Sequence, residues 1–185
     1  NKNKRQYRCG IANMLRIGSW RRYNSTKAVY EDIYYAMSTT GAFFLYMEDT
    51  YEVEGEPYFG YMRSKYSIAE MKEIDEFCSS INMEAIPCIQ TLAHFTSTAK
   101  IPHYWDLFDI DDILMIGDEK VYALLDKIFA SLAKAFSSRR INIGMDEAHN
   151  VGLGKYLNEH GYCNRSEILV QHLNKVNEIA KKYGF

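Results

Sequence analysis

The sequence predicts an α/β fold built around a parallel sheet. Short apolar runs typical of strands alternate with segments whose apolar residues recur at helical spacing. This alternation repeats about four times along the 185 residues, and strands joined through helices form parallel sheets with right-handed crossovers. Two architectures fit this order: an open doubly wound sheet, and a (β/α)8 barrel, which needs about 250 residues. Four strand–helix units would make half of such a barrel.

Four segments are expected to form the strands. Gly10–Ile17 is the first, and Ala42–Met47 is an uninterrupted apolar run, typical of a strand that is buried on both faces. Ala85–Ile89 is a short third strand, although Pro87 lacks an N–H group and argues against a central position in a sheet. Ile141–Met145 is expected to be a fourth, buried strand.

Four helices are expected to follow these strands or connect them. Ser, Asp and Asn side chains cap helix N-termini by accepting from free backbone N–H groups, and Gly often follows the last turn. Ser67 and Glu70 have the spacing of a capping box, in which each side chain satisfies the other residue's N–H group. The predicted helices are residues 24–39, followed by Gly41; Ser67 to about Ile81; a helix capped by Asp118; and a helix capped by Asn164 with Glu167.

Composition is that of a single domain over residues 1–185, with the weakest pattern in residues 1–23. The net charge of −2 gives no electrostatic reason to expect nucleic acid or an anionic membrane as a partner. No apolar run is long enough to cross a membrane, and no signal peptide is visible. The 4 cysteines form no close pair, which argues against zinc and redox motifs and favours free thiols in a reducing, cytoplasmic compartment.

Polar side chains follow three of the predicted strands, at the carboxyl ends where active sites of parallel α/β folds lie. Side chains alternate between the faces of a strand, so adjacent carboxylates converge on one site only where the strand becomes a loop. The simpler alternatives are solvated loops and, for Asp146 and Glu147, an acidic helix cap. The strand-end residues are Glu48 and Asp49; Gln90 and His94; and Asp146, Glu147 and His149.

Several chemistries lack their sequence motifs. There is no glycine-rich phosphate loop and no nucleophile elbow, and neither His94 nor His149 has a histidine partner at the spacing of a zinc site. We therefore expect no metal and no cofactor. A rim of carboxylates, histidine and aromatic residues suits glycoside hydrolysis, in which a carboxylic acid protonates the leaving oxygen. The long connection from Gln90 to Gly117 is expected to be a functional loop.

The segment I-N-I-G-M-D-E, from Ile141 to Glu147, resembles the H-x-G-G-D-E signature of family 20 glycoside hydrolases, the β-N-acetylhexosaminidases. Asn142 replaces the signature histidine, and Met145 replaces its second glycine. The similarity to one bacterial branch of the family extends from about Phe43 to Phe185. It is carried by L-Y-M-E-D-T-Y-E-V-E-G-E-P-Y-F-G-Y-M-R, I-P-C-I-Q-T-L-A-H and R-R-I-N-I-G-M-D-E-A-H-N-V-G-L-G-K-Y-L.

The resemblance implies a TIM (β/α)8 barrel of which this chain supplies about the first four β/α units, a half barrel. It implies an exo-acting enzyme that removes terminal β-linked GlcNAc or GalNAc with retention, using the sugar's own 2-acetamido oxygen as nucleophile. Glu147 would be the general acid/base, and Asp146 would hold the acetamido group. The residues expected to bind the sugar are His94, Asp49, Glu48 and His149. Members of the family also bind sugar hydroxyls with an arginine after the first strand, for which the candidates are Arg16, Arg21 and Arg22.

Two other functions fit the same residues. One is a non-catalytic or vestigial carbohydrate-binding module. The other is a metal-dependent TIM-barrel hydrolase that uses Glu48, Asp49, Asp146 and His94. As a β-N-acetylhexosaminidase the half barrel is expected to be inactive alone, and its open sheet edges would allow a homodimer.

Overall fold

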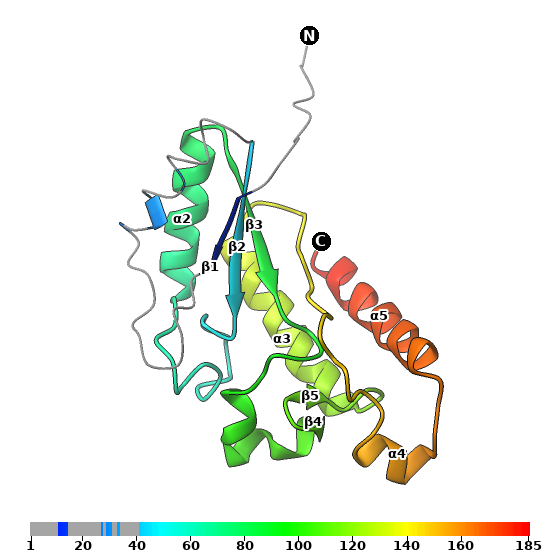
Figure 1. The fold of residues 1–185 in the computed structure, drawn as a ribbon. Helices are drawn as coiled ribbons and strands as arrows, with labels where there is room; N and C mark the ends of the chain where they lie inside the picture. The colour runs from blue at the N-terminus through cyan, green and yellow to red at the C-terminus, as the bar shows by residue number, and fades with distance from the viewer. Residues whose placement is uncertain (1–10, 15–26, 28, 31–32, 34–40) are drawn as a thin grey trace.

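The computed structural model describes residues 11–14, 27, 29–30, 33 and 41–185. Its sheet has three parallel strands in the order β1 (Ile11–Met14), β2 (Ala42–Glu48) and β3 (Glu84–Ile89). The carboxyl ends of these strands point the same way, downward in Figure 1. The predicted α/β class and parallel pairing are confirmed. Most of the predicted helix 24–39 lies outside the described residues, as do Arg16, Arg21 and Arg22.

One face of β2 carries the apolar core. Phe43, Leu45 and Met47 are fully buried in the same cluster as apolar residues of α2 (Ile68–Ser80) and α3 (Glu119–Ala135). Phe44 and Tyr46, on the other face, are only partly buried. The prediction that this strand is buried on both faces is therefore wrong, because no element in the described part of the chain fully covers the second face.

The three predicted N-terminal helix caps, Ser67, Asp118 and Asn164, are confirmed. Ser67 and Glu70 form the capping box of α2, and the Asp118 side chain accepts from the N–H of Lys120 at the start of α3. Asn164 accepts from Ser166 at the start of α5 (Arg165–Lys182). A short helix that was not predicted, α4 (Lys155–His160), precedes it. Among the described residues, no helix combines the length and the hydropathy needed to cross a membrane.

The segment 141–145 lies beside β3 but is not the buried strand that was predicted. It makes an isolated parallel bridge at Asn142, whose N–H donates to the Pro87 carbonyl and whose carbonyl accepts from Ile89. Its residues are partly or largely exposed, and Gly144 has a φ of 51°. A regular ladder is prevented because Pro87 has no N–H to donate on this side and Gly144 turns the backbone.

The connection after β3 is more ordered than a loop. It contains two 3-10 helices, η1 (Thr98–Lys100) and η2 (Pro102–Leu107), and an antiparallel hairpin of β4 (Phe108–Ile110) and β5 (Ile113–Leu114). These elements and α4 lie beyond the carboxyl ends of the parallel strands, at the bottom of Figure 1. The sheet thus ends in a layer of ordered connections, and the candidate site lies at this end.

Candidate active site

His94, Asp146 and Glu147 lie together beyond the ends of β3 and the segment beside it. His94 Nε2 is 3.4 Å from Asp146 Oδ2 and 3.6 Å from Glu147 Oε2. His94 and Glu147 have left-handed backbones, with φ of 64° and 56°. Such conformations are uncommon for residues other than glycine and gather at functional sites. The turn at Glu147 allows adjacent carboxylates to approach one imidazole ring.

This cluster is open to a ligand on the carboxylate side. The side chains of Asp146 and Glu147 are 62% and 69% exposed, whereas that of His94 is 24% exposed. His94 Nε2 is shielded from solvent and makes no hydrogen bond within the described part of the chain. The site therefore consists of a partly buried imidazole ring with two accessible carboxylates on one side. Such carboxylates could transfer a proton and stabilise positive charge on a ligand.

A cleft of about 670 Å³ adjoins Asp146, between the end of the sheet and α5. Its polar side includes Tyr46 and Gln90, and Gln90 Nε2 donates to both Asp146 Oδ1 and Tyr46 Oη. Its apolar side comes from α5 and from the segment beside β3: Leu169, Val170, Leu173, Ile143 and Met145. Space for a ligand or another segment therefore exists next to the carboxylates.

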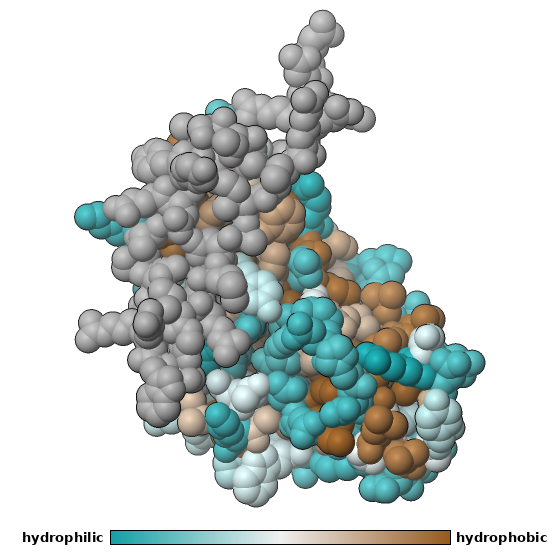
Figure 2. Space-filling model, in the orientation of Figure 1, coloured by the Kyte–Doolittle hydropathy of each residue, from teal (hydrophilic) through white to brown (hydrophobic). Residues whose placement is uncertain are grey.

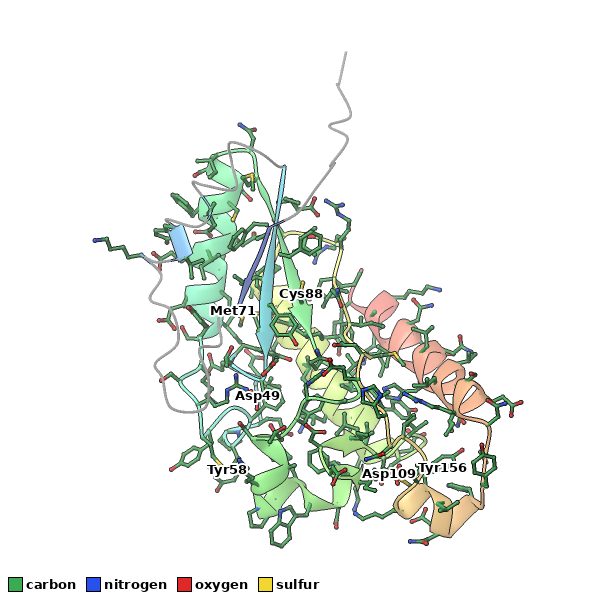
Figure 3. All side chains as sticks on the ribbon, viewed as in Figure 1. Asp49, Tyr58, Met71, Cys88, Asp109 and Tyr156 are labelled. Atoms are coloured by element: carbon green, nitrogen blue, oxygen red, sulfur yellow. The ribbon has the colours of Figure 1, made fainter. Side chains whose placement is uncertain are left out.

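Glu48 and Asp49 form a separate, buried cluster with Arg63. Arg63 Nη1 donates to Glu48 Oε2 at 2.9 Å and to Asp49 Oδ1 at 2.5 Å, and Thr98 donates to Asp49 Oδ2 at 3.2 Å. Asp49 lies at the lower end of β2 in Figure 3 and is fully buried. Burial raises its pKa, and the neighbouring Arg63 charge only partly opposes this. Within the described residues, no hydrogen bond or ion pair joins these two carboxylates to Asp146 or Glu147, and their sugar contacts stay a prediction.

His149 follows the carboxylates but points into solvent. It is exposed, and its backbone N–H donates to the Glu147 carbonyl at 2.7 Å. Its predicted contact with the substrate stays a prediction. In the described part of the chain, no group of three or more His, Cys, Asp or Glu side chains is arranged to hold a metal ion.

Solved structures with the same fold carry names that describe the same kind of enzyme. No protein-family model matches the sequence, and neither does any curated protein. A family 20 exo-β-N-acetylglucosaminidase from Vibrio harveyi, solved with N-acetylglucosamine, superimposes with a TM-score of 0.77 at 17% identity, over 95% of this chain and 34% of that chain. The β-N-acetylhexosaminidase from Bacteroides fragilis NCTC 9343 superimposes with a TM-score of 0.78 at 15% identity, over 96% of this chain and 40% of that chain. The family 20 β-N-acetylhexosaminidase from Streptomyces coelicolor A3(2) superimposes with a TM-score of 0.72 at 18% identity, over 97% of this chain and 38% of that chain.

This chain has the fold of a segment of the family 20 glycoside hydrolases. The sequence resemblance is thereby confirmed at the level of fold. The chain spans between about a third and two fifths of these three structures. Its α/β arrangement therefore corresponds to part of a family 20 enzyme, whose fold contains a TIM barrel.

Two residues that organise the described part of the chain were missed in the sequence. Arg63 pairs with the carboxylates at the end of β2, and Asp109 accepts from the N–H groups of Gly152 and Tyr156, each at 2.8 Å. Figure 3 shows Asp109 beside Tyr156. Gly154 passes so close to Asp109 that a Cβ would lie 2.2 Å from its carbonyl oxygen. No local pattern marks these residues, because their partners are distant in sequence.

Proposed function

We propose that this chain belongs to the catalytic domain of a family 20 β-N-acetylhexosaminidase. The enzyme removes terminal β-linked GlcNAc or GalNAc with retention of configuration. The observation that carries the proposal is the meeting of His94, Asp146 and Glu147 at the carboxyl end of a parallel sheet with this fold. Neither the fold nor an acidic turn would suffice alone.

Glu147 acts as the general acid and then as the general base. Its exposed carboxyl group protonates the glycosidic oxygen as the bond from that oxygen to the anomeric carbon breaks. The acetamido oxygen of the substrate forms the new bond to the anomeric carbon and gives a cyclic intermediate. Water then attacks the anomeric carbon and gives a proton to Glu147, and the bond from the anomeric carbon to the acetamido oxygen breaks. The two inversions produce net retention.

Asp146 accepts the acetamido N–H and stabilises the positive charge that develops on the nucleophile. A carboxylate placed where charge develops lowers the barrier because it is oriented before the reaction starts. Asp146 is suited to this role, since its Oδ1 is held by Gln90 and its side chain remains 62% exposed. His94 lies against both carboxylates and limits how they turn.

We further propose that the chain supplies the first four β/α units of the barrel. Support comes from the open side of segment 141–145: Ile143 and Met145 make no backbone hydrogen bond within the described residues. Beside them, Val170 and Leu173 of α5 are 55% and 43% exposed. Figure 2 shows hydrophobic surface over the region between the sheet and α5. An apolar strand placed there would pair with the free backbone groups and cover these side chains.

The test uses the natural protein that carries this sequence. It should hydrolyse 4-nitrophenyl β-N-acetylglucosaminide but not 4-nitrophenyl β-glucoside, because the glucoside lacks the acetamido nucleophile. Proton NMR of early product should show the β-anomer, and activity should survive dialysis against EDTA. Release of the α-anomer, or loss of activity with EDTA, would refute the proposed mechanism and favour a different hydrolase. Binding of N-acetylglucosamine without hydrolysis would instead identify a carbohydrate-binding module.

A further inference from the structure

We infer that Gln90 is a positioning residue that fixes the orientation of Asp146, an inference that rests on the function proposed above. Gln90 immediately follows β3 and is 1% exposed. Its side chain spans the sheet end between Tyr46 of β2 and the turn that carries Asp146. Through Gln90, the Asp146 carboxylate that would hold the acetamido group is thus linked by hydrogen bonds to two strands that precede it in the chain.

The hydrogen bonds use the full donor capacity of the Gln90 amide. Nε2 carries two hydrogens, and its two acceptors are Asp146 Oδ1 at 3.3 Å and Tyr46 Oη at 3.0 Å. Within the described residues, this is the one hydrogen bond that the Asp146 side chain accepts. Asp146 Oδ2 is left facing His94 Nε2 and solvent. One carboxylate oxygen is therefore anchored, and the other is available to a substrate N–H.

Gly144 provides the space that Gln90 occupies. A Cβ at this position would lie 2.5 Å from Gln90 Oε1 and 2.3 Å from the Ile89 carbonyl oxygen, both too close for real contacts. Gly144 also has a φ of 51°, which side chains other than glycine rarely adopt. Its carbonyl accepts from Thr91 at 3.0 Å. The backbone two residues before Asp146 is thus fitted to the buried Gln90 side chain.

The amide is chemically suited to this position. A neutral donor favours the ionised form of a carboxylate, whereas a second carboxylate at the same distance would oppose it. Acceptance of the acetamido N–H requires ionised Asp146. Gln90 would therefore act on the direction of the Asp146 side chain without adding a negative charge beside it. Loss of one hydrogen bond to a charged group corresponds to about 10–100-fold in rate if it operates fully in the transition state.

The experiment compares Gln90→Leu and Gln90→Glu in the natural protein with matched controls at Gln171, an exposed glutamine on α5. Gln90→Leu should lower kcat about 10–100-fold on both a nitrophenyl glycoside and a natural disaccharide, with little change in KM. Gln90→Glu should move the acidic limb of the kcat/KM profile to higher pH. In an Asp146→Ala background, Gln90→Leu should have no further effect. Gln171→Leu and Gln171→Glu should behave as the natural protein.

Full activity of Gln90→Leu would overturn the inference. So would an unshifted pH profile in Gln90→Glu, or an undiminished effect of Gln90→Leu in the Asp146→Ala background, because either result indicates a purely structural role. Circular dichroism of each variant establishes that it is folded. If the natural protein does not hydrolyse N-acetylhexosaminides, the proposed function fails. The contact is then tested separately by carbon-13 NMR: the carboxyl titration midpoint of Asp146 should rise in Gln90→Glu and stay unchanged in Gln171→Glu.

Discussion

Asp146 Oδ2 lies 3.4 Å from His94 Nε2, although His94 follows β3 and Asp146 follows the separate segment 141–145. Parallel alignment explains this contact, because segment 141–145 runs beside β3 and both end at the same edge. His94 has a left-handed backbone, and its ring faces the carboxylates of the neighbouring turn. The proposed chemistry depends on this alignment of β3 and segment 141–145.

Replacing Arg63 with Met should destabilise the protein, and more strongly at pH 7 than at pH 5. The variant removes the Arg63 charge that lies beside the buried carboxylates Glu48 and Asp49, a loss of about 3–5 kcal/mol when Asp49 is charged. Burial already raises the pKa of Asp49, so its folded state holds a proton more tightly than the unfolded state. Stability therefore falls as pH rises above the ordinary value of 3.8.

Urea unfolding at the two pH values measures this effect. Arg63→Lys is the matched control, since it keeps a positive charge near the carboxylates, and it should lose less stability than Arg63→Met. Equal losses for Arg63→Met at pH 5 and pH 7 would show that the carboxylates are not the reason for the destabilisation.

His172 should make the protein less stable in acid. It is fully buried, with Nε2 2.9 Å from the Thr91 carbonyl oxygen, and burial lowers its pKa despite that hydrogen bond. Below its ordinary value of 6.5, the unfolded chain takes up a proton that the folded protein resists. Stability should fall as pH decreases from 6.5, by up to about 1.4 kcal/mol per pH unit from this group.

The measurement is the urea midpoint between pH 7 and pH 5 for the natural protein and for His172→Gln. The variant should show a smaller decrease across this range. His160→Gln, at an exposed histidine on α4, serves as the control and should leave the slope unchanged. Parallel slopes for the natural protein and His172→Gln would contradict the assignment.

Asp109→Ala should lower the free energy of unfolding. It removes both acceptors for the N–H groups of Gly152 and Tyr156, and each unsatisfied buried donor costs about 1–3 kcal/mol. Thermal unfolding is the measurement. Asp106→Ala, at a side chain that is 80% exposed, should change stability little. A stability near that of the natural protein for Asp109→Ala would show that α4 does not depend on this contact.

The elements that were predicted correctly depend on neighbours in sequence. The capping box at Ser67 and Glu70 closes within one turn, so its pattern is visible without any tertiary information. The prediction of a buried strand at 141–145 was wrong because burial depends on which element lies on the far side of the segment. The apolar residues of the segment itself do not reveal that element. The hairpin β4–β5 was missed because its strands are too short for a periodic pattern.

The residues of the candidate site likewise include some that local sequence patterns predicted and others that they did not. Asp146, Glu147 and His94 could be found because each follows an apolar run, and the family resemblance gave them roles. Arg63 and Asp109 could not, because their contacts join residues up to 15 and 47 positions apart and leave no local signature. Gln90 was noticed as a strand-end residue, but its bond to Asp146 across 56 positions required the structure.

The open edge at Ile143 and Met145 should make residues 1–185 associate in solution at micromolar concentration. Unpaired backbone groups next to exposed apolar side chains of α5 favour pairing with another chain. Val170→Glu should weaken this association, because a charge would be buried in the contact. Gln171→Glu, on the same exposed stretch of α5, is the control. Light scattering measures the mass, and a monodisperse monomer of the natural sequence would contradict the prediction.

The central claim is that Asp146 and Glu147 have different tasks, and leaving-group dependence tests it most directly. kcat/KM is measured in the natural protein, Glu147→Gln and Asp146→Asn, on a nitrophenyl glycoside and on a natural disaccharide. Glu159→Gln, at an exposed carboxylate on α4, is the matched control and should retain full activity. Glu147→Gln should nearly abolish disaccharide cleavage but spare much of the nitrophenyl reaction, whose leaving group departs without a proton. Asp146→Asn should slow both substrates by about 10²–10³-fold. The same leaving-group sensitivity in both variants would contradict the assignment.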